Sequence, residues 1–308
     1  MSRTVFLGTS DFAATVLRRL HESEHRPQLV VTPPDSRRGR GRHLHPPPAA
    51  AAARELGVDL LQAESVNSPE ALERVQAAKP DAAVVCAFGQ LIREPLLSEH
   101  LMLNVHPSLL PRWRGAAPIE RAIMAGDQRT GVSVMRVTEG LDSGPVALQE
   151  GTPIDPDEDF GALAPRLAAI GGEVIVRALD LMAAGELELV EQDDAQATYA
   201  EKIESTERRL DPSRPADELA RRVRALTPHV GAYLQLQGDE RLGVRAVVVE
   251  DGDGEPGSLR ADDGALLLDC GAGRLRLEVV HPAGKRPMSG AEYVRGHSIP
   301  DRAMLQND

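Results

Sequence analysis

The sequence predicts an α/β protein, in which a doubly wound, mostly parallel sheet is followed by a small β-barrel of the OB-like kind. The first half alternates short apolar runs with amphipathic stretches, a pattern typical of parallel strands joined by crossover helices. The second half holds short β-like runs separated by turns rich in Gly and Asp. A length of 308 residues is comfortable for two such domains.

Apolar runs predict the strands of the first half in order. Residues 4–7 form the first, followed by a turn with capping chemistry at 8–11 and a helix at 12–20. A second helix is expected at about 69–78, and a long helical pattern at about 160–183 closes this part of the chain. The remaining strands are expected at residues 29–31, 82–87, 101–106, 131–137 and 146–149.

After about residue 189 the sequence becomes polar and loses a clear period. We therefore expect a first domain at residues 1–188, a linker at 189–205 and a second domain at 206–308. Within the second domain one helix, at 217–226, precedes the β-like runs. These strands are expected at residues 245–250, 265–269 and 275–280.

The composition bears on whether the protein binds nucleic acid or a membrane, and on the compartment expected for it. With four Phe, three Tyr and one Trp, the protein is poorly equipped to read single strands by stacking bases on aromatic rings. The net charge of −12 disfavours general binding to polyanions, so a nucleic-acid partner would need a local basic patch. Two widely spaced Cys fit a reducing compartment, and no apolar run is long enough for a membrane span. We expect a cytoplasmic protein without a membrane partner or an obligatory protein partner.

Three polar residues suggest a reaction site. Asn104 and His106 lie two apart at the end of an expected strand, so both side chains project to the same face, and Pro107 then ends strand pairing. Ligands bind at this edge of open α/β sheets. Asp142 follows in a Gly-flanked loop. Taken alone, each residue is more often part of a turn, but together an amide, an imidazole and a carboxylate suit transfer of an acyl-type group to an amine.

No covalent nucleophile is evident. Ser108 and Ser143 lack the G-x-S-x-G context of a serine hydrolase. Direct transfer between two bound substrates is therefore the simpler interpretation. Leu109 and Leu110, which follow Ser108, are on periodicity alone more typical of a core than of a binding site.

The motifs at residues 104–115 and 140–144 resemble those of the formyltransferase family that uses 10-formyltetrahydrofolate. Further matches, to the methionyl-tRNA formyltransferases within this family, lie at residues 8–13, 106–119, 198–202 and 282–289. The resemblance implies an enzyme of translation initiation and one-carbon metabolism that formylates the methionine of initiator methionyl-tRNA. It implies that Asn104, His106 and Asp142 are catalytic. It further implies that the turn at 87–89 lies beside a folate site lined by Ser108, Leu109, Leu110 and Pro111.

The local basic patch required for RNA is present at residues 35–43, where four Arg lie among glycines. Arg side chains give bidentate contacts to phosphate, although a charged run is often only a solvated loop. The resemblance assigns this patch to the acceptor stem of the tRNA. The residues concerned are Arg37, Arg38, Arg40 and Arg42, and Lys285 and Arg286 could extend the basic surface. We expect no metal, because His43 and His45 have no further ligands nearby.

Three alternative functions would require other features of the sequence. A dehydrogenase would need a G-x-G-x-x-G motif, which is missing after Gly8. An RNA-binding module would not need the three polar residues, and a formyltransferase for a small acceptor would need neither the Arg patch nor the second domain. The family commonly has a Trp where this chain has Asp211-Pro212, and often has Pro-Trp-Pro where this chain has Pro228-His229-Val230. These departures concern the packing and the tRNA contacts of the second domain, not the three polar residues.

Overall fold

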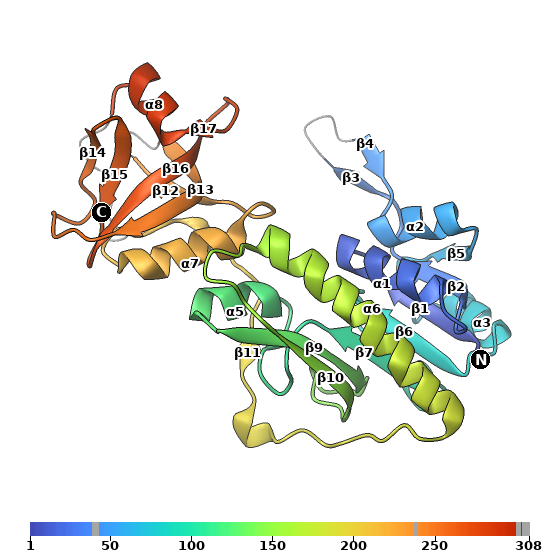
Figure 1. The fold of residues 1–308 in the computed structure, drawn as a ribbon. Coiled ribbons are helices and arrows are strands. Elements are labelled where there is room, and N and C mark those ends of the chain that lie inside the picture. Colours follow the sequence, from blue (N-terminus) through green and yellow to red (C-terminus); the bar gives the residue numbers. More distant parts are fainter. Residues whose placement is uncertain (39–42, 237–239, 300–302, 304–308) are drawn as a thin grey trace. The chain divides into compact units, whose positions relative to one another are not determined.

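The computed structural model describes residues 1–38, 43–236, 240–299 and 303 (Figure 1). These residues divide into two units. The first contains Met1–Pro118, Arg129–Pro153 and Ala164–Ala200. The second contains Ile119–Gln128, Ile154–Leu163 and Glu201–Asp308. Short pieces of the first 163 residues thus belong to the second unit, and each unit is described by itself below.

The first unit is built on a seven-stranded sheet with the order β10-β9-β7-β6-β1-β2-β5. Five neighbouring strands run parallel, whereas β9 is antiparallel to β7 and β10 is antiparallel to β9. This agrees with the predicted doubly wound, mostly parallel sheet. The strands are β1 (Thr4–Gly8), β2 (Pro27–Thr32), β5 (Asp59–Gln62), β6 (Ala82–Cys86), β7 (Met102–His106), β9 (Arg129–Arg136) and β10 (Val146–Pro153).

Helices connect these strands and begin where the sequence supplies capping groups. Ser10 caps α1 and Ser68 caps α3, each by accepting a hydrogen bond from a backbone N–H of the first turn. The helices are α1 (Asp11–His21), α2 (Pro48–Leu56), α3 (Pro69–Ala77), α4 (Leu96–Glu99), α5 (Pro118–Ala125) and α6 (Phe160–Ala184). Two pairs of short strands lie outside the main sheet: β3 (Ser36–Arg38) with β4 (His43–His45), and β8 (Arg114–Gly115) with β11 (Tyr199–Ala200).

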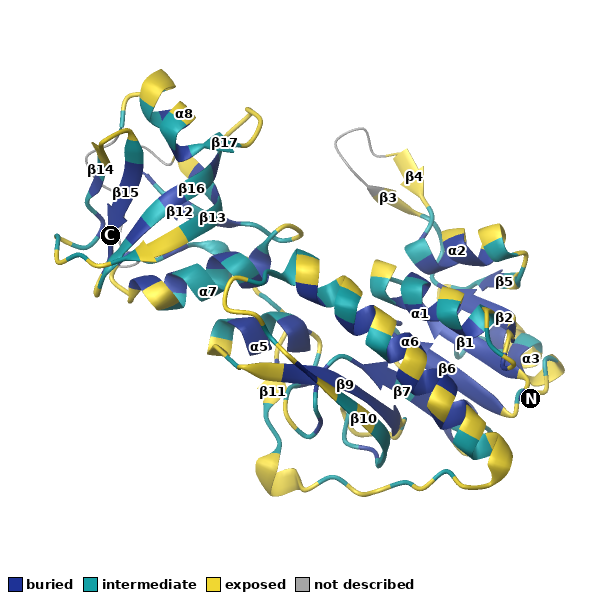
Figure 2. Ribbon diagram, viewed as in Figure 1, coloured by how far each residue is buried: buried dark blue, intermediate teal, exposed yellow. Residues whose placement is uncertain are grey.

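The central strands are buried on both faces, as Figure 2 shows, because helices cover the sheet. Val5 and Leu7 belong to a core cluster with Ala71 and Val75 of α3. On the opposite face, α6 approaches β7 closely at Gly171. A Cβ added there would lie 2.8 Å from Cγ1 of Val105, so the glycine allows this contact. Since successive strand residues alternate faces, Asn104 and His106 point to the face away from α6.

The second unit is a small antiparallel β domain with the strand order β12-β13-β16-β15-β14, and β17 pairs with β16. Its inward-facing residues alternate with polar ones along β16 and surround one core. This agrees with the predicted small barrel. Its elements are β12 (Ala232–Gln235), β13 (Arg241–Glu250), β14 (Leu259–Asp262), β15 (Ala265–Asp269), β16 (Arg274–Pro282), β17 (Met288–Ser289), α7 (Ala216–Leu226) and α8 (Gly290–Gly296). Two 3-10 turns lie near the end of the expected linker. They are η1 (Asp194–Gln196) in the first unit and η2 (Ser205–Arg208) in the second.

The unusual residues of the second unit are integrated into its packing. His229 stacks on Phe160 with ring centroids 3.7 Å apart, and its Nε2 lies 2.9 Å from Oε1 of Glu120. Pro212 is buried, and Val230 packs partly buried against the core. These contacts give the three residues defined positions. Among the residues that the structure describes, no helix has both the length and the apolarity needed to cross a bilayer.

Candidate functional site

The carboxylate of Asp142 is the centre at which the three polar residues meet. Oδ1 of Asp142 lies 3.4 Å from the amide nitrogen of Asn104, and Oδ2 lies 3.5 Å from Nδ1 of His106. The side chain of His106 is 5% exposed and that of Asp142 is 16% exposed. The structure therefore brings together residues 38 positions apart in the sequence. Contacts of this length commonly tighten when a substrate binds.

The imidazole of His106 faces acceptors at both nitrogens. Nε2 lies 2.8 Å from the carbonyl oxygen of Trp113, which can only accept, so Nε2 carries the hydrogen. Nδ1 faces the Asp142 carboxylate. A neutral ring donates from one nitrogen only, whereas the charged ring donates from both and satisfies both contacts. The Trp113 carbonyl is in turn positioned by its own backbone N–H, which donates to Oγ1 of Thr198 at 2.9 Å.

Gly115 supplies a backbone contact to the same carboxylate. Its N–H donates to Oδ2 of Asp142 at 2.9 Å. Gly115 has a φ of 120°, and a Cβ added there would lie 2.8 Å from the carbonyl oxygen of Ala200. Both the backbone conformation and the close approach of β11 therefore require a glycine. Asp142 itself has a φ of 45°, in the left-handed region that a short polar residue tolerates better than most.

The motif at 104–115 includes Arg114 and Gly115, but nothing in the sequence indicates a role for either residue. The support of His106 by Trp113 and Thr198 was likewise not predicted. The available signal was local: a glycine after a run of bulky residues marks a position where another backbone approaches. No pattern in the sequence indicates which backbone that is, because β8 pairs with β11 across more than 80 residues.

The turn predicted to bind folate is largely engaged in internal contacts. Ser108 is fully buried, and its hydroxyl donates to the carbonyl of Arg112 at 2.6 Å. The N–H of Leu110 donates to Oγ of Ser133, and the carbonyl of Leu110 accepts from the amide of Gln149. Leu110 is 5% exposed, whereas Leu109 and Pro111 are half-buried. The apolar side chains of Leu109 and Pro111 are thus the parts of this turn that remain accessible.

The neighbouring turn at 87–89 is fixed to the first strand. Oγ1 of Thr9 donates to the carbonyl of Phe88 at 2.8 Å, and Phe88 is buried in the core that includes Val85. Cys86, which ends β6, is also buried, and burial raises the pKa of its thiol far above the ordinary value. This thiol stays neutral near pH 7 and is unsuited to act as a nucleophile.

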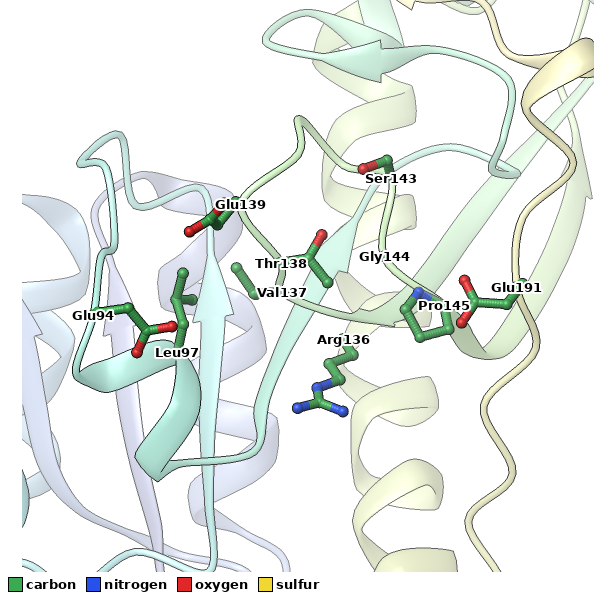
Figure 3. Close-up of a pocket in the computed structure, with 10 residues that line it drawn as sticks. All are labelled: Glu94, Leu97, Arg136, Val137, Thr138, Glu139, Ser143, Gly144, Pro145 and Glu191. Carbon is green, nitrogen blue, oxygen red and sulfur yellow. The ribbon is translucent and has the colours of Figure 1, made fainter.

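A cavity of about 500 Å³ borders the loop that carries Asp142 (Figure 3). Figure 3 shows Glu94 and Leu97 on one side of it, with Pro145 and Glu191 on the other. Ser143 of the loop contributes to its wall. No residue of the predicted site lines this cavity, so sequence reasoning missed it. The lining residues are Glu94, Leu97, Arg136, Val137, Thr138, Glu139, Ser143, Gly144, Pro145 and Glu191.

Two of the predicted RNA-binding arginines lie in a short described strand. Arg37 and Arg38 are in β3, which pairs with β4 so that Arg37 is opposite Leu44. Arg37 is exposed. Arg40 and Arg42 lie outside the described residues. Over the described part of the chain, no three His, Cys, Asp or Glu side chains cluster in a way that could hold a metal ion.

Comparison with known proteins places this geometry in a family. Residues 2–179 match the model of the formyl transferase family, and residues 202–298 match that of the formyl transferase C-terminal domain. A methionyl-tRNA formyltransferase of Halorhodospira halophila is 44% identical over 303 residues, which cover 97% of each chain. A methionyl-tRNA formyltransferase of Methylococcus capsulatus is 43% identical over 300 residues, which cover 96% of this chain and 97% of the relative.

The solved structures add support for the fold. HypX from Aquifex aeolicus, in complex with tetrahydrofolic acid, is 18% identical and superimposes with a TM-score of 0.66. The match covers 99% of this chain but 51% of HypX, so the chain spans about half the length of that protein. At this identity the likeness concerns the fold alone. The two domain matches and the full-length relatives establish that the chain belongs to the formyltransferase family and, within it, to the methionyl-tRNA formyltransferases.

Proposed function

We propose that this protein transfers the formyl group of 10-formyltetrahydrofolate to the amino group of methionine on initiator tRNA. The observation that carries the proposal is the meeting of Asn104 and His106 with the carboxylate of Asp142. This meeting occurs in a chain whose full-length relatives, at 40–44% identity, are methionyl-tRNA formyltransferases. The product is N-formylmethionyl-tRNA, which serves translation initiation.

In the proposed reaction the neutral amine of methionine attacks the formyl carbon. A new C–N bond forms, and the bond between this carbon and N10 of the folate breaks. One proton leaves the amine, and one arrives at the departing nitrogen, so the exchange needs no oxidant or metal. The side-chain amide of Asn104 has a second hydrogen besides the one directed at Asp142, and we assign it to the formyl oxygen.

In this scheme the carboxylate of Asp142 receives the proton that leaves the amine, and His106 lies beside it. The carboxylate of Asp142 accepts from Asn104 and from the Gly115 N–H, and its Oδ2 lies 3.5 Å from Nδ1 of His106. These contacts hold its two oxygens in fixed directions. It can take the amine proton directly or through one water. For His106 to donate to the formyl oxygen instead, Nε2 must leave the carbonyl of Trp113. We therefore propose Asn104 as the main stabiliser of the oxyanion and His106 as the partner of Asp142.

The folate donor has two candidate positions in the first unit. The prediction from the family resemblance, the turn at Ser108, Leu109, Leu110 and Pro111, offers the apolar faces of Leu109 and Pro111. The cavity beside the Asp142 loop offers a hollow of suitable size for a flat ring system, with the carboxylates of Glu94 and Glu139 as acceptors for ring N–H groups. The two positions can be distinguished by filling the cavity with a larger side chain at Thr138.

For the tRNA, we propose that the arginines at 37, 38, 40 and 42 contact phosphates. Arg37 is exposed, which supports this proposal. The acidic net charge of the whole chain repels RNA in general, and a local basic segment counters that repulsion. Lys285 and Arg286 are exposed in the second unit and could add to the basic surface. We also propose that residues 1–188 form the catalytic domain and that residues 206–308 form the tRNA-binding domain.

The deciding experiment is formyl transfer from 10-formyltetrahydrofolate to charged initiator methionyl-tRNA. We expect product with the wild-type protein and a loss of at least about 100-fold with His106→Ala. In the same assay Arg40→Ala should raise the KM for tRNA and reduce its dependence on salt, while the KM for the donor stays constant. Formylation of a small amine in preference to methionyl-tRNA, or hydrolysis of the donor alone, would overturn the proposed acceptor.

A further inference from the structure

The loop that carries Asp142 has few contacts of its own to fix its shape. Glu139, Gly140 and Leu141 are exposed, and the side chain of Leu141 is 63% exposed. The backbone at Asp142 adopts a positive φ, which is strained for a residue with a Cβ. Such a conformation persists only where surrounding groups hold it. The contacts that do so come from a distant segment.

Gln192, which lies outside this loop, forms hydrogen bonds to its backbone. Its amide nitrogen donates to the carbonyl of Asp142 at 2.8 Å and to the carbonyl of Gly144 at 2.7 Å. One amide group thus uses both of its hydrogens on two carbonyls that flank Ser143. These bonds fix the direction of the backbone on either side of the loop's last turn. Gln192 is half-buried, so water competes less for the same carbonyls than it would at a fully exposed site.

The orientation of Gln192 is itself determined by Arg114. Oε1 of Gln192 accepts from Nε of Arg114 at 3.0 Å, which decides which end of the amide is the donor. The side chain of Arg114 is 3% exposed, and its Nη2 pairs with Oδ1 of Asp194 at 2.8 Å. The Asp194 side chain is 83% exposed. A buried guanidinium therefore links the surface carboxylate to the amide that holds the loop.

Arg114 also precedes Gly115, whose N–H donates to the side chain of Asp142. The same two-residue strand, β8, therefore acts on Asp142 by two routes. One route is the direct bond from Gly115 to the carboxylate. The other passes from the Arg114 side chain through Gln192 to the backbone carbonyl of Asp142.

We infer that Gln192 is a positioning residue for the formyl transfer, which holds the Asp142 loop in its reactive geometry and is oriented by Arg114 and Asp194. The inference rests on the proposed role of Asp142. Gln192 lies on the polar stretch that follows α6, where the sequence pattern predicts a linker. This stretch thus contributes a part of the reaction site.

The test compares kcat and KM for Gln192→Leu and Gln192→Glu with a matched variant, Gln196→Leu. Gln196 is an exposed glutamine four residues further on, whose amide contacts only Asp193 among the bonds described. We expect the two Gln192 variants to lower kcat by about 10- to 100-fold, because a displacement of about 1 Å at a reacting group has an effect of this size. The KM for methionyl-tRNA and the kcat of Gln196→Leu should stay within about twofold of wild type.

Two further variants separate positioning from folding. Asp194→Asn removes only the exposed carboxylate charge and should lower kcat by about two- to fivefold without a change in melting temperature. Introduced into Asp142→Asn, the Gln192→Leu change should slow single-turnover transfer by less than about threefold, because the group it positions is already lost.

The outcomes are distinguishable. A Gln192→Leu protein with wild-type kcat, or one whose full loss persists in the Asp142→Asn background, would overturn the inference. If the Gln192 variants do not fold, a wild-type kcat for Asp194→Asn would also overturn the inference. A near-normal kcat of Asp142→Asn itself would instead overturn the proposed role of Asp142, whatever the Gln192 variants do.

Discussion

Two segments of the first unit meet at the candidate site, and they are held in place in different ways. The segment from Asn104 to Gly115 begins inside the main sheet and continues into a turn whose polar groups bond to neighbouring residues of the same unit. The loop at 139–144 is exposed at its first three residues and depends on groups from remote parts of the chain, above all Gln192 and Gly115. The reactive geometry therefore joins two parts. We call the segment 104–115 the rigid half, because it is held within the sheet and its own turn, and the loop 139–144 the adjustable half, because its contacts come from other segments.

The largest effect is expected in the rigid half. Asn104→Ala should lower kcat by about 100- to 1,000-fold, as removal of an oxyanion donor does elsewhere. Stability should change little, since Asn104 is half-buried and bonds weakly to Asp142 at 3.4 Å. Steady-state kinetics with saturating donor and tRNA measure the loss. Asn104→Asp keeps the shape without the donor and should be equally impaired. Retention of kcat by either variant would remove Asn104 from the mechanism.

An intermediate effect is expected where the halves join. Gly115→Ala places a Cβ against the carbonyl of Ala200 and disfavours the φ of 120°. We expect a loss of about 1–3 kcal/mol in the free energy of unfolding. As the N–H shifts away from Asp142, kcat should also fall by about tenfold. Denaturant unfolding and kinetics are measured on the same samples.

Gly185→Ala is the matched control for this change. Gly185 also has a positive φ, of 73°, but nothing lies within 4 Å of an added Cβ. It should lose about 1 kcal/mol of stability from the backbone alone and keep its kcat. If Gly185→Ala lowered kcat as much as Gly115→Ala, the loss would reflect general destabilisation rather than the contact with Asp142.

The smallest effect is expected on the outer side of the adjustable half. Thr138→Trp fills part of the cavity beside the loop without disturbing the core, because Thr138 is exposed. If the donor's ring system lies there, its KM should rise about three- to tenfold with little change in kcat. Thr138→Val, which adds no bulk, is the control. A constant KM for the donor would favour the turn at Leu109 and Pro111 as the folate position.

Most of the first unit could be predicted because its signals are local. The strands β1 and β6 are buried throughout and, apart from Thr4, apolar. Ser10 lies in the predicted capping turn and starts α1, and Ser68 precedes the helix that was expected from about residue 69. The hairpin of β3 and β4 and the short strands β8 and β11 were not predicted. Each of these strands has two or three residues, which is too short to show a period, and its pairing depends on contacts rather than on propensity.

The sequence by itself determined the fold class, the family, and the face of β7 on which Asn104 and His106 lie, since strand alternation and contiguous motifs are local properties. Only the tertiary structure decided that the Asp142 carboxylate lies between them, that Trp113 and Gly115 complete their contacts, and that a cavity borders the loop. The physical reason is that these contacts, apart from the one between His106 and Trp113, join residues far apart in the chain. Their distances are set by the packing of the whole unit, which no short stretch of sequence encodes.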